Sequence, residues 1–316
     1  MSTNEENTPI ENRREIIFLY DVIRSNPNGD PDDGNRPRMD ENGYNIVTDV
    51  RLKRTIRDYW ISQKDSERSV LIKQQYMDDD KTVMSMRDIV AKELQIDENI
   101  TRKDIIDQLP KKFLDVRSFG AAVTLPGANV SITGPVQFGI GISLNKPELI
   151  SLTITTVMSS TGEQGAGSMG QTHILDYSLI SFHGIVCETN CEKLNFTAKD
   201  LKAIYDGLWD GTKKLNTRSK FNHQPHLILA IVSKEKEFQI GGLDTKLRLE
   251  KEEGIKQVDQ VVILIDDFME TLLEHQDKIL KIEYKESKEL QYMYQGTQRT
   301  SIEEIFAGTG INLETI

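Results

Sequence analysis

The chain has 316 residues, of which 39 are basic and 50 acidic, and its formal net charge is −11. No apolar run is long enough to span a membrane, and the polar first 13 residues lack the hydrophobic segment of a signal peptide. Its two cysteines, Cys187 and Cys191, are too few for a disulfide framework and lack the second ligand pair of a zinc site. We therefore expect a cytoplasmic protein whose residues 1–13 are a disordered lead-in.

The chain opens with signals for a strand, a long loop and a helix. Residues 14–23 form an apolar, β-rich run, which predicts a buried strand. Residues 26–38 are dense in Asn, Asp, Pro and Gly, which predicts a turn-rich loop. Thr48 is placed as the N-cap of an amphipathic helix. The expected apolar positions of this helix are Val50, Leu52, Ile56, Tyr59 and Trp60.

The rest of the chain alternates between helical and strand patterns. Residues 64–112 are charged and helical in pattern, with Thr101 and Asp104 placed as a capping box, so we expect a helical insertion. The glycine-rich segment 160–170 lies between strand patterns and predicts the tip of a protruding β-hairpin. The other expected elements are strands over 113–125 and 132–144 and from Leu149, a strand before Cys187, a helix over 196–209 capped by Thr197, a strand over 226–233, and a helix and a strand beyond residue 260.

This order of elements predicts an α+β fold with a ferredoxin-like or RRM-like sheet and insertions, rather than a doubly wound parallel sheet. Gly165–Gly170 matches G-x-G-x-x-G, but β-rich runs flank it on both sides, so it does not indicate a dinucleotide site. The acidic cluster Asp30, Asp32 and Asp33 fails the EF-hand pattern. No catalytic motif appears, and we predict no catalytic residues, no metal and no cofactor.

Two basic clusters stand out from the acidic background. An acidic body repels a phosphate backbone, but RNA binding depends on where the charges lie rather than on their sum. The second cluster lies in a polar segment rich in phosphate donors, and together the two can form a cationic track. The first cluster is Arg36, Arg38, Arg51, Lys53, Arg54 and Arg57; the second is Lys213, Lys214, Arg218 and Lys220.

Several unusual segments occur in one order over residues 14–233. They are FLYDVIRSNPNGDPDDGNRPRMDENGYNIVTDVRLKRTIRDYW, DVRSFGAAVT, GPVQFGIGIS, GSMGQTHILDYSLISFHGIV and GLWDGTKKLNTRSKFNHQPHLILAIV. In this order they resemble the repeated backbone subunit of type I CRISPR Cascade complexes, in the I-B and I-C branch of the RAMP superfamily.

The resemblance implies a hand-shaped protein that polymerises head to tail along the CRISPR guide RNA and presents it for pairing with target DNA. Its partners would be the guide RNA, target DNA through the guide, copies of itself and the other Cascade subunits, with no membrane. Base pairing then reads the sequence while the protein holds the backbone. The implied parts are an RRM-like palm over 14–63 and 113–316, a helical finger over 64–112, and a thumb hairpin over 151–175 within the palm.

The resemblance also implies which residues contact RNA. One departure is that QTHIL follows Gly170, where relatives often carry an arginine or lysine. Together with the basic clusters, the implied RNA-binding residues are Asn26, Asn28, Arg36, Arg38, Arg51, Lys53, Arg54, Arg117, Phe119, Met169, Gly170, Lys213, Arg218, Ser219, Lys220 and His223.

Two other functions are consistent with the sequence. The first is a metal-dependent endoribonuclease of the same superfamily, in which Asp21, Asp30 or Asp49 would be catalytic. Magnesium-dependent RNA cleavage that an Asp-to-Ala change abolishes would favour it. The second is an acidic protein-interaction module without an RNA role, which would purify free of nucleic acid even when a guide is supplied.

Overall fold

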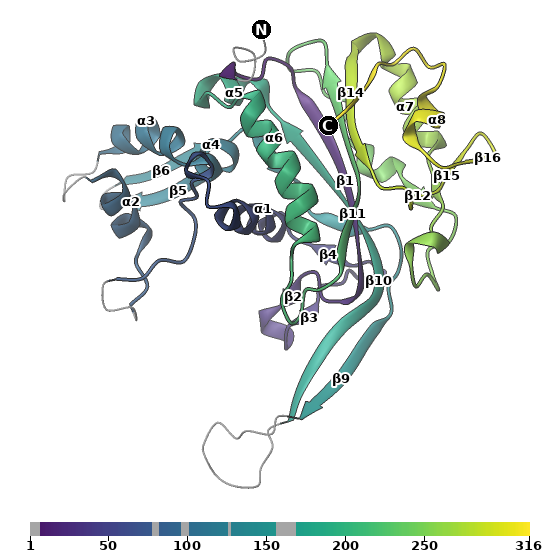
Figure 1. The fold of residues 1–316 in the computed structure, drawn as a ribbon, viewed down its shortest axis with the longest axis horizontal. Helices are drawn as coiled ribbons and strands as arrows, with labels where there is room; N and C mark the ends of the chain where they lie inside the picture. The colour runs from purple at the N-terminus through teal and green to yellow at the C-terminus, as the bar shows by residue number, and fades with distance from the viewer. Residues whose placement is uncertain (1–6, 78–81, 96–100, 126–127, 156–168) are drawn as a thin grey trace.

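The computed structural model has a mixed α/β fold and describes residues 7–77, 82–95, 101–125, 128–155 and 169–316 (Figure 1). A twisted sheet runs through its middle, with helices on both faces and a long hairpin projecting from one end. The helices are α1 Asp49–Gln63, α2 Met86–Leu94, α3 Arg102–Lys112, α4 Leu114–Phe119, α5 Glu188–Leu194, α6 Ala198–Asp206, α7 Asp266–Glu274 and α8 Ile302–Phe306. None of these helices is long and apolar enough to cross a bilayer.

The central sheet is built around two long strands, β1 and β10. The strands of this sheet are β1 Arg14–Ser25, β4 Ile46–Val47, β7 Val136–Phe138, β8 Gly141–Ser143, β9 Leu149–Thr155, β10 Met169–Val186, β11 His223–Ser233, β14 Ile279–Glu286 and β17 Leu313–Thr315. Their order is β17-β14-β11-β1-β10-β8-β4, and β7 and β9 also pair with β10. Phe18 of β1 faces Phe182 on one side and Ile228 on the other, in antiparallel register.

The two faces of the sheet carry separate hydrophobic cores. Successive side chains of a strand point to opposite faces, so Ile16 and Phe18 pack under α1 and α6 while Ile17 and Leu19 pack on the other side. That second face is covered by residues 234–278 and 287–312, which we call the C-terminal lobe. The predicted strands over 14–23 and 226–233 are therefore confirmed, and both are buried.

Helix α1 begins where the sequence predicts. The side chain of Thr48 accepts a hydrogen bond from the Arg51 amide and caps the helix. Leu52, Ile56 and Trp60 are buried as expected, but Val50 is 68% exposed, so its assignment to the apolar face is wrong. Val50 lies in the first turn of α1.

Helix α6 packs unusually close to α1. It continues as a π-helical turn over Gly207–Gly211, in which a Cβ at Gly207 would meet Ile56 at 2.6 Å and one at Gly211 would meet Tyr59 at 3.0 Å. Only glycine permits this approach at Gly207. The predicted cap at Thr197 is present at the start of α6, where Thr197 forms a capping box with Asp200.

The insertion after α1 has its own small core. Helices α2 and α3 pack against a hairpin of β5 Gly120–Leu125 and β6 Ala128–Thr133 in one cluster that includes Ile105, Val123 and Val130. The predicted capping box of Thr101 and Asp104 is confirmed. The strand expected over 113–125 is wrong in its first half, which forms α4, because a short apolar run does not distinguish a buried helix from a buried strand. The strand expected over 132–144 is divided among β6, β7 and β8.

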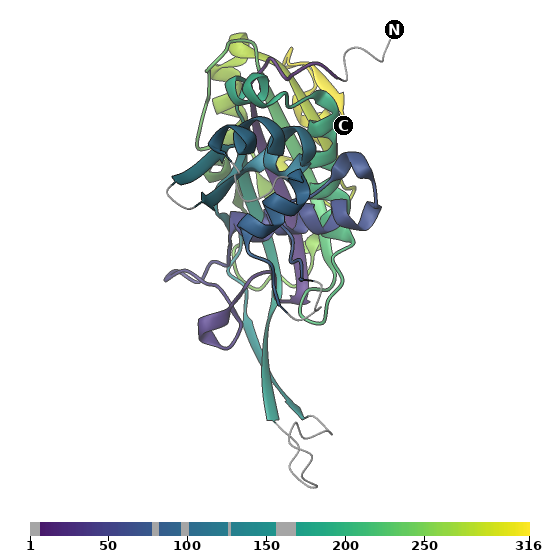
Figure 2. The ribbon, with the colours of Figure 1, turned by 90° about the vertical axis from the view of Figure 1, so that its left-hand side faces the viewer.

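A hairpin of β9 and the first half of β10 projects from the sheet, as Figures 1 and 2 show. We call these residues, 149–155 and 169–175, the arm. Of the predicted tip at 160–170, residues 160–168 lie outside the described residues, and Met169 and Gly170 begin β10. The segment QTHILDYS lies in β10, which confirms that no helix follows the G-x-G-x-x-G match.

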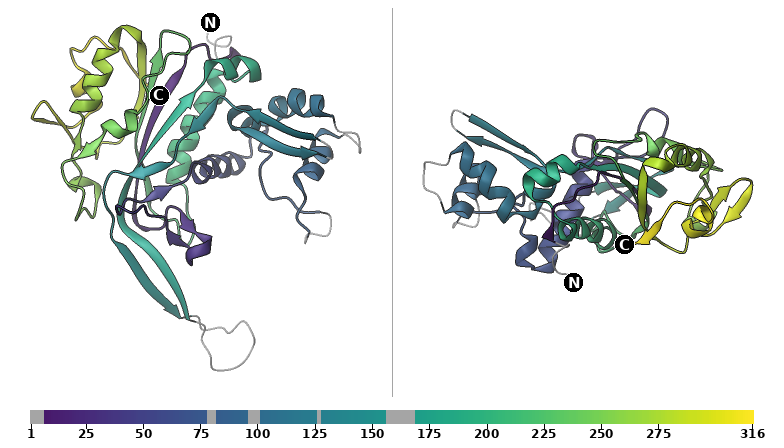
Figure 3. Two further views of the ribbon diagram at one scale, coloured as in Figure 1. Left: turned by 180° about the vertical axis from the view of Figure 1, so that it is seen from behind. Right: turned by 90° about the horizontal axis from the view of Figure 1, so that it is seen from above.

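The C-terminal lobe lies on the opposite side of the sheet from the insertion (Figure 3). Its strands are β12 Arg248–Leu249, β13 Ile263–Leu264, β15 Tyr292–Tyr294 and β16 Thr297–Arg299, and the loop after β1 contains β2 Gly29–Asp30 and β3 Arg36–Pro37. At the other end of the chain, Ile10 is buried and its amide donates to the carbonyl of Phe196 at 3.0 Å. The expected disordered lead-in therefore does not extend to Ile10, because that side chain joins the core.

Candidate RNA-binding face

Three exposed or half-buried members of the first basic cluster are held by acidic side chains. Arg38 lies 3.0 Å from Asp30, and Arg54 lies 3.0 Å from Asp58 one helical turn away. Lys53 lies 3.1 Å from Asp49 and donates a second hydrogen bond to Gln137. Each of these cations already has an acidic partner, which reduces what it offers to a phosphate.

Arg57 forms a buried pair that stabilises the fold. Its Nε lies 3.0 Å from the Oδ2 of Asp115, which is fully buried and also accepts from the amides of Leu71 and Ile72. The helix α1 is thereby joined to the start of the insertion. Arg57 thus faces the core, and its sequence-based placement on a cationic surface is wrong.

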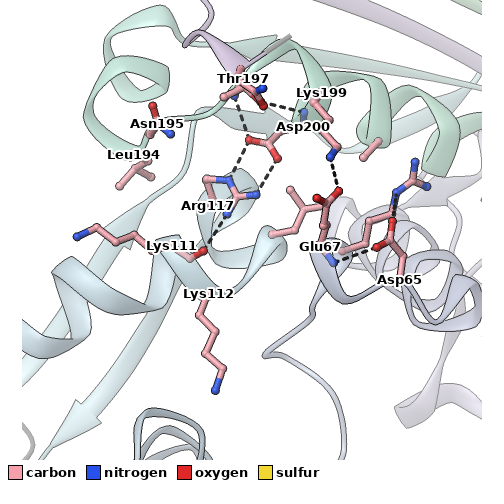
Figure 4. Close-up of a pocket in the computed structure, with 14 residues that line it drawn as sticks. Asp65, Glu67, Lys111, Lys112, Arg117, Leu194, Asn195, Thr197, Lys199 and Asp200 are labelled. Atoms are coloured by element: carbon pink, nitrogen blue, oxygen red, sulfur yellow. Dashed lines mark hydrogen bonds and ion pairs between the residues drawn. The ribbon is translucent and has the colours of Figure 1, made fainter. Parts of the chain in front are cut away.

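Arg117 lies in a pocket of about 500 Å³ between the insertion and the α5–α6 corner (Figure 4). Its guanidinium makes two hydrogen bonds to Asp200, of 2.9 and 2.7 Å, and a third to the carbonyl of Pro110. Figure 4 shows Arg117 turned toward Asp200, while Lys112 points away. The bidentate geometry uses the donors that Arg117 would offer to a phosphate.

Phe119 is buried and does not face solvent. Its ring stacks on Trp60 with a centroid separation of 5.8 Å, and the guanidinium of Arg57 lies 5.1 Å above it. The DVRSFG segment therefore supports the junction of α1 with the insertion.

Asn26 and Asn28 hold the loop after β1. The buried amide of Asn26 donates to the carbonyls of Asn35 and His173, so it ties this loop to the base of the arm. The Oδ1 of Asn28 accepts from both the amide and the hydroxyl of Thr48, 2.9 Å each. Both side chains thus fix the N-terminus of α1 relative to the sheet.

A second set of cations has no acidic partner. No ion pair within 4.0 Å joins these side chains to any acid in the part of the chain that the structure describes. Lys214 also has no acidic partner among the described residues, but it is left out of the set because its ammonium lies 5.1 Å over the ring of Tyr59. The unpaired set is Arg36, Arg51, Lys213, Arg218 and Lys220, of which Arg36, Lys213 and Arg218 are exposed.

Arg51 and Lys220 lie close enough to affect each other. Burial, followed by the positive charge of Arg51, lowers the pKa of Lys220 to about 8. Burial also lowers the pKa of the Arg51 guanidinium. Two half-buried cations side by side would both be stabilised by an anion between them.

His223 lies beneath these cations. It is buried, stacks on Tyr20 at 5.8 Å and lies 3.2 Å from the hydroxyl of Ser25. Burial, and then the positive charges of Arg51 and Lys220, lower the pKa of His223 to about 3. His223 is therefore neutral near pH 7 and supports the site from below.

The remaining predicted residues lie at the edges of this face. The carbonyl of Ser219 accepts from the amide of Asn26 and the hydroxyl of Ser25, which holds the 213–220 loop against β1. Gly170 is exposed on the arm, opposite Ile154, and Met169 begins β10. The side chain of Met169 is not among those described.

Sequence analysis missed Phe221. This large aromatic side chain is 64% exposed directly after Lys220. Exposed aromatic rings beside cations are the platforms on which single-stranded bases stack. An isolated aromatic residue in a Ser-, Asn- and Lys-rich loop was the available signal.

The three acids of the endoribonuclease alternative each lie beside a different basic residue. Asp21 is buried beside His226 at 3.1 Å, Asp30 pairs with Arg38, and Asp49 pairs with Lys53. Among the described residues, no group of three or more His, Cys, Asp or Glu side chains is arranged to hold a metal ion.

The mixed α/β fold is similar to that of two chains of known structure. It is similar to a chain titled "CRISPR RNA-guided surveillance complex, pre-nicking", with a TM-score of 0.53, 12% identity and 96% coverage of each chain. A second such chain, titled "CRISPR RNA-guided surveillance complex", gives a TM-score of 0.50 with 13% identity, covering 86% of this chain and 88% of that one.

The family follows from the sequence comparisons. The family model described as CRISPR-associated protein Cas7 matches residues 12–266, and the chain belongs to this family. A curated relative, "CRISPR-associated protein Cas7" of Haloferax volcanii, is 29% identical over 292 residues, 85% of each protein. The family resemblance read from the sequence is confirmed.

Proposed function

We propose that this chain is the guide-RNA-binding backbone subunit of a type I CRISPR surveillance complex, of the I-B or I-C branch. The observation that carries the proposal is the set of cations without acidic partners beside the base of the arm. Because these cations lie near one another on α1 and the loop before β11, they give an acidic protein a localised site for a polyanion. Its partners would be the guide RNA, target DNA through that guide, further copies of this chain and the other subunits, in the cytoplasm.

We infer that the palm is RRM-like. The order β1, α1, β7 and β8, β10, α6, β11 is a β-α-β-β-α-β sequence of elements. The sheet order β11-β1-β10-β8 places the fourth strand beside the first and the third on its other side. This is the support for the ferredoxin-like arrangement.

The other parts of the hand follow from the hydrophobic clusters. The insertion would be the finger, and it would extend past residue 112 to Thr133, because β5 and β6 share the core of α2 and α3. The arm would be the thumb, continuing on both sides into the glycine-rich segment. The palm would then comprise residues 14–63 and 134–316.

The RNA path would follow the unpaired cations toward the arm. Arg51, Lys213, Arg218 and Lys220 would contact phosphates, with Phe221 stacking on a base and Met169 and Gly170 near the point where the arm crosses the strand. Seven of the other predicted residues would support this face from within: Asn26, Asn28, Lys53, Arg117, Phe119, Ser219 and His223. Of the remaining three, exposed Arg36 would also contact a phosphate, whereas Arg38 and Arg54, each paired with an acid, would contribute less. The chain would act by holding RNA, without a catalytic step of its own.

The test is to co-express the chain with its CRISPR array and neighbouring genes, purify the particle and run its nucleic acid on a denaturing gel. We expect RNA of uniform length in a particle that contains several copies of this chain. Assembly of the other subunits around a guide without this chain would overturn the proposal. Magnesium-dependent shortening of the RNA that Asp21→Ala abolishes would favour the endoribonuclease instead.

A further inference from the structure

The root of the arm carries a charged contact to the C-terminal lobe. Glu148 and Asp176 face each other where β9 and β10 leave the sheet, and the amide of Glu148 donates to the Oδ1 of Asp176 at 2.8 Å. The Nζ of Lys256, from the C-terminal lobe, lies 2.5 Å from the Oδ2 of Asp176 and 2.9 Å from Glu148. One lysine therefore bridges both strands of the arm at their root.

The carboxylate of Asp176 is buried, which makes this contact more than a surface pair. Its Oδ1 accepts from the amides of Glu148 and Tyr177, and its Oδ2 faces Lys256. Without the lysine, Asp176 would keep a buried negative charge whose second oxygen has lost its cation. The unpaired charge would destabilise the backbone turn between the sheet and the arm, which Asp176 holds.

The segment that carries Lys256 is itself fixed to the body of the protein. Leu249 and Ile255 are buried in the core beneath the sheet, one on each side of the loop. Between them, the Oε2 of Glu252 accepts from the Tyr44 hydroxyl at 2.7 Å, and its carbonyl accepts from the amide of Lys146 at 2.7 Å. The loop from Leu249 to Lys256 is therefore held to the body of the protein at several points.

The arm is also held from its other side. The side-chain amide of Asn26 donates to the carbonyl of His173, and the ring of His173 lies 2.8 Å from the hydroxyl of Ser151 across the hairpin. Figures 1 and 2 show the arm extending beyond these contacts without further support from the body. The angle of the arm is thus determined at its root.

We propose that the segment Glu250–Lys256 positions the arm, with Lys256 as the positioning residue that fixes the angle at which the arm leaves the sheet. The inference rests on the proposed function, because the angle matters through where the arm crosses the guide RNA. The C-terminal lobe then sets the spacing of RNA segments without touching RNA. Lys256 lies near the end of the family match, in a loop that has no other assigned role.

The first measurement is hydrogen–deuterium exchange of peptides covering 145–150 and 172–178 in the RNA-free protein. Lys256→Met keeps the stem and removes the charge, and Lys251→Met, an exposed lysine of the same loop without a described ion pair, is the matched control. We expect exchange at the arm root to rise about threefold in Lys256→Met and to stay unchanged in Lys251→Met. Equal exchange in both variants would overturn the proposal.

The second measurement separates positioning from simple stability. Hydroxyl-radical footprints of guide RNA in assembled particles should show regular protection with the parent chain and blurred protection with Lys256→Glu, at equal RNA occupancy. Lys256→Arg, which keeps a cation between Glu148 and Asp176, should keep the regular pattern. If the parent particle carries no RNA, the proposed function fails while the exchange result still stands; if Lys256→Glu leaves the footprint sharp, the positioning role fails alone.

Discussion

The two basic regions of this protein differ in how their charges are used. On α1, Arg54 and Arg57 each have a carboxylate partner 3.0 Å away, whereas Lys213, Arg218 and Lys220 on the loop before β11 have none among the described residues. The sequence shows both regions as similar clusters of Arg and Lys. The difference teaches that the number of cations in a segment says little about its function until their partners are known.

The buried end of this comparison predicts the largest effect. Asp115→Ala leaves Arg57 and two backbone amides without their acceptor in the core, so we expect a loss of about 3 to 5 kcal/mol in the free energy of unfolding. Chemical denaturation measures this. Asp58→Ala, which removes the exposed partner of Arg54, is the matched control and should change stability by about 0.5 kcal/mol or less. Similar losses of stability in both variants would show that the buried Arg57–Asp115 pair contributes no more to the fold than the exposed Arg54–Asp58 pair.

The unpaired end predicts a large effect on RNA binding alone. Lys213→Glu with Arg218→Glu and Lys220→Glu should weaken guide-RNA affinity about 100-fold at moderate salt, because three phosphate contacts become repulsions. Filter binding or fluorescence anisotropy measures this loss. The control Lys236→Glu with Lys246→Glu and Lys251→Glu changes net charge equally on the C-terminal lobe and should cost only a few-fold. Equal losses would mean that overall charge, and not the position of these side chains, governs binding.

The lowered pKa of Lys220 sharpens the comparison by pH. In the free protein, Lys220 begins to lose its proton near pH 8. A bound phosphate favours the charged lysine, so RNA binding above this pH should be accompanied by uptake of a proton at Lys220. We expect affinity to fall about tenfold between pH 7 and pH 9, and Lys220→Arg to remove most of that fall. The unfolded chain holds more protons than the folded one between pH 8 and 10.5, so this group makes the free protein more stable as pH rises. Weaker binding at high pH would therefore not reflect unfolding through Lys220.

Local patterns predicted most of the helix and strand positions. The caps at Thr48, Thr101 and Thr197 are present where expected, because a capping side chain bonds to an amide only two or three residues away. The run from Leu114 to Phe119 was predicted as part of a strand and is a helix. Its conformation depends on the distant Arg57 and Trp60, which sequence periodicity does not reveal.

The candidate site was predictable by region and not by residue. The family motifs and the basic segments led to the loop and the helix of the candidate site, yet they gave equal weight to exposed Arg218, buried His223 and paired Lys53. Which cation is neutralised depends on side chains far away in the chain, such as Gln137 for Lys53. The role of Lys256 was missed for the same reason, since its partners lie 80 and 108 positions earlier.

One strand, β10, belongs to both the arm and the centre of the sheet. It runs without a break from Met169 to Val186, and its second half is hydrogen-bonded to β1 along nearly the whole of that strand. A load applied to this side of the arm along its axis is therefore carried as shear by many backbone hydrogen bonds that must break together. β9, in contrast, ends at the arm root and can peel away bond by bond. The two strands of the arm therefore differ in mechanical strength. Under tension, the hydrogen bonds of β9 should break before those of β10.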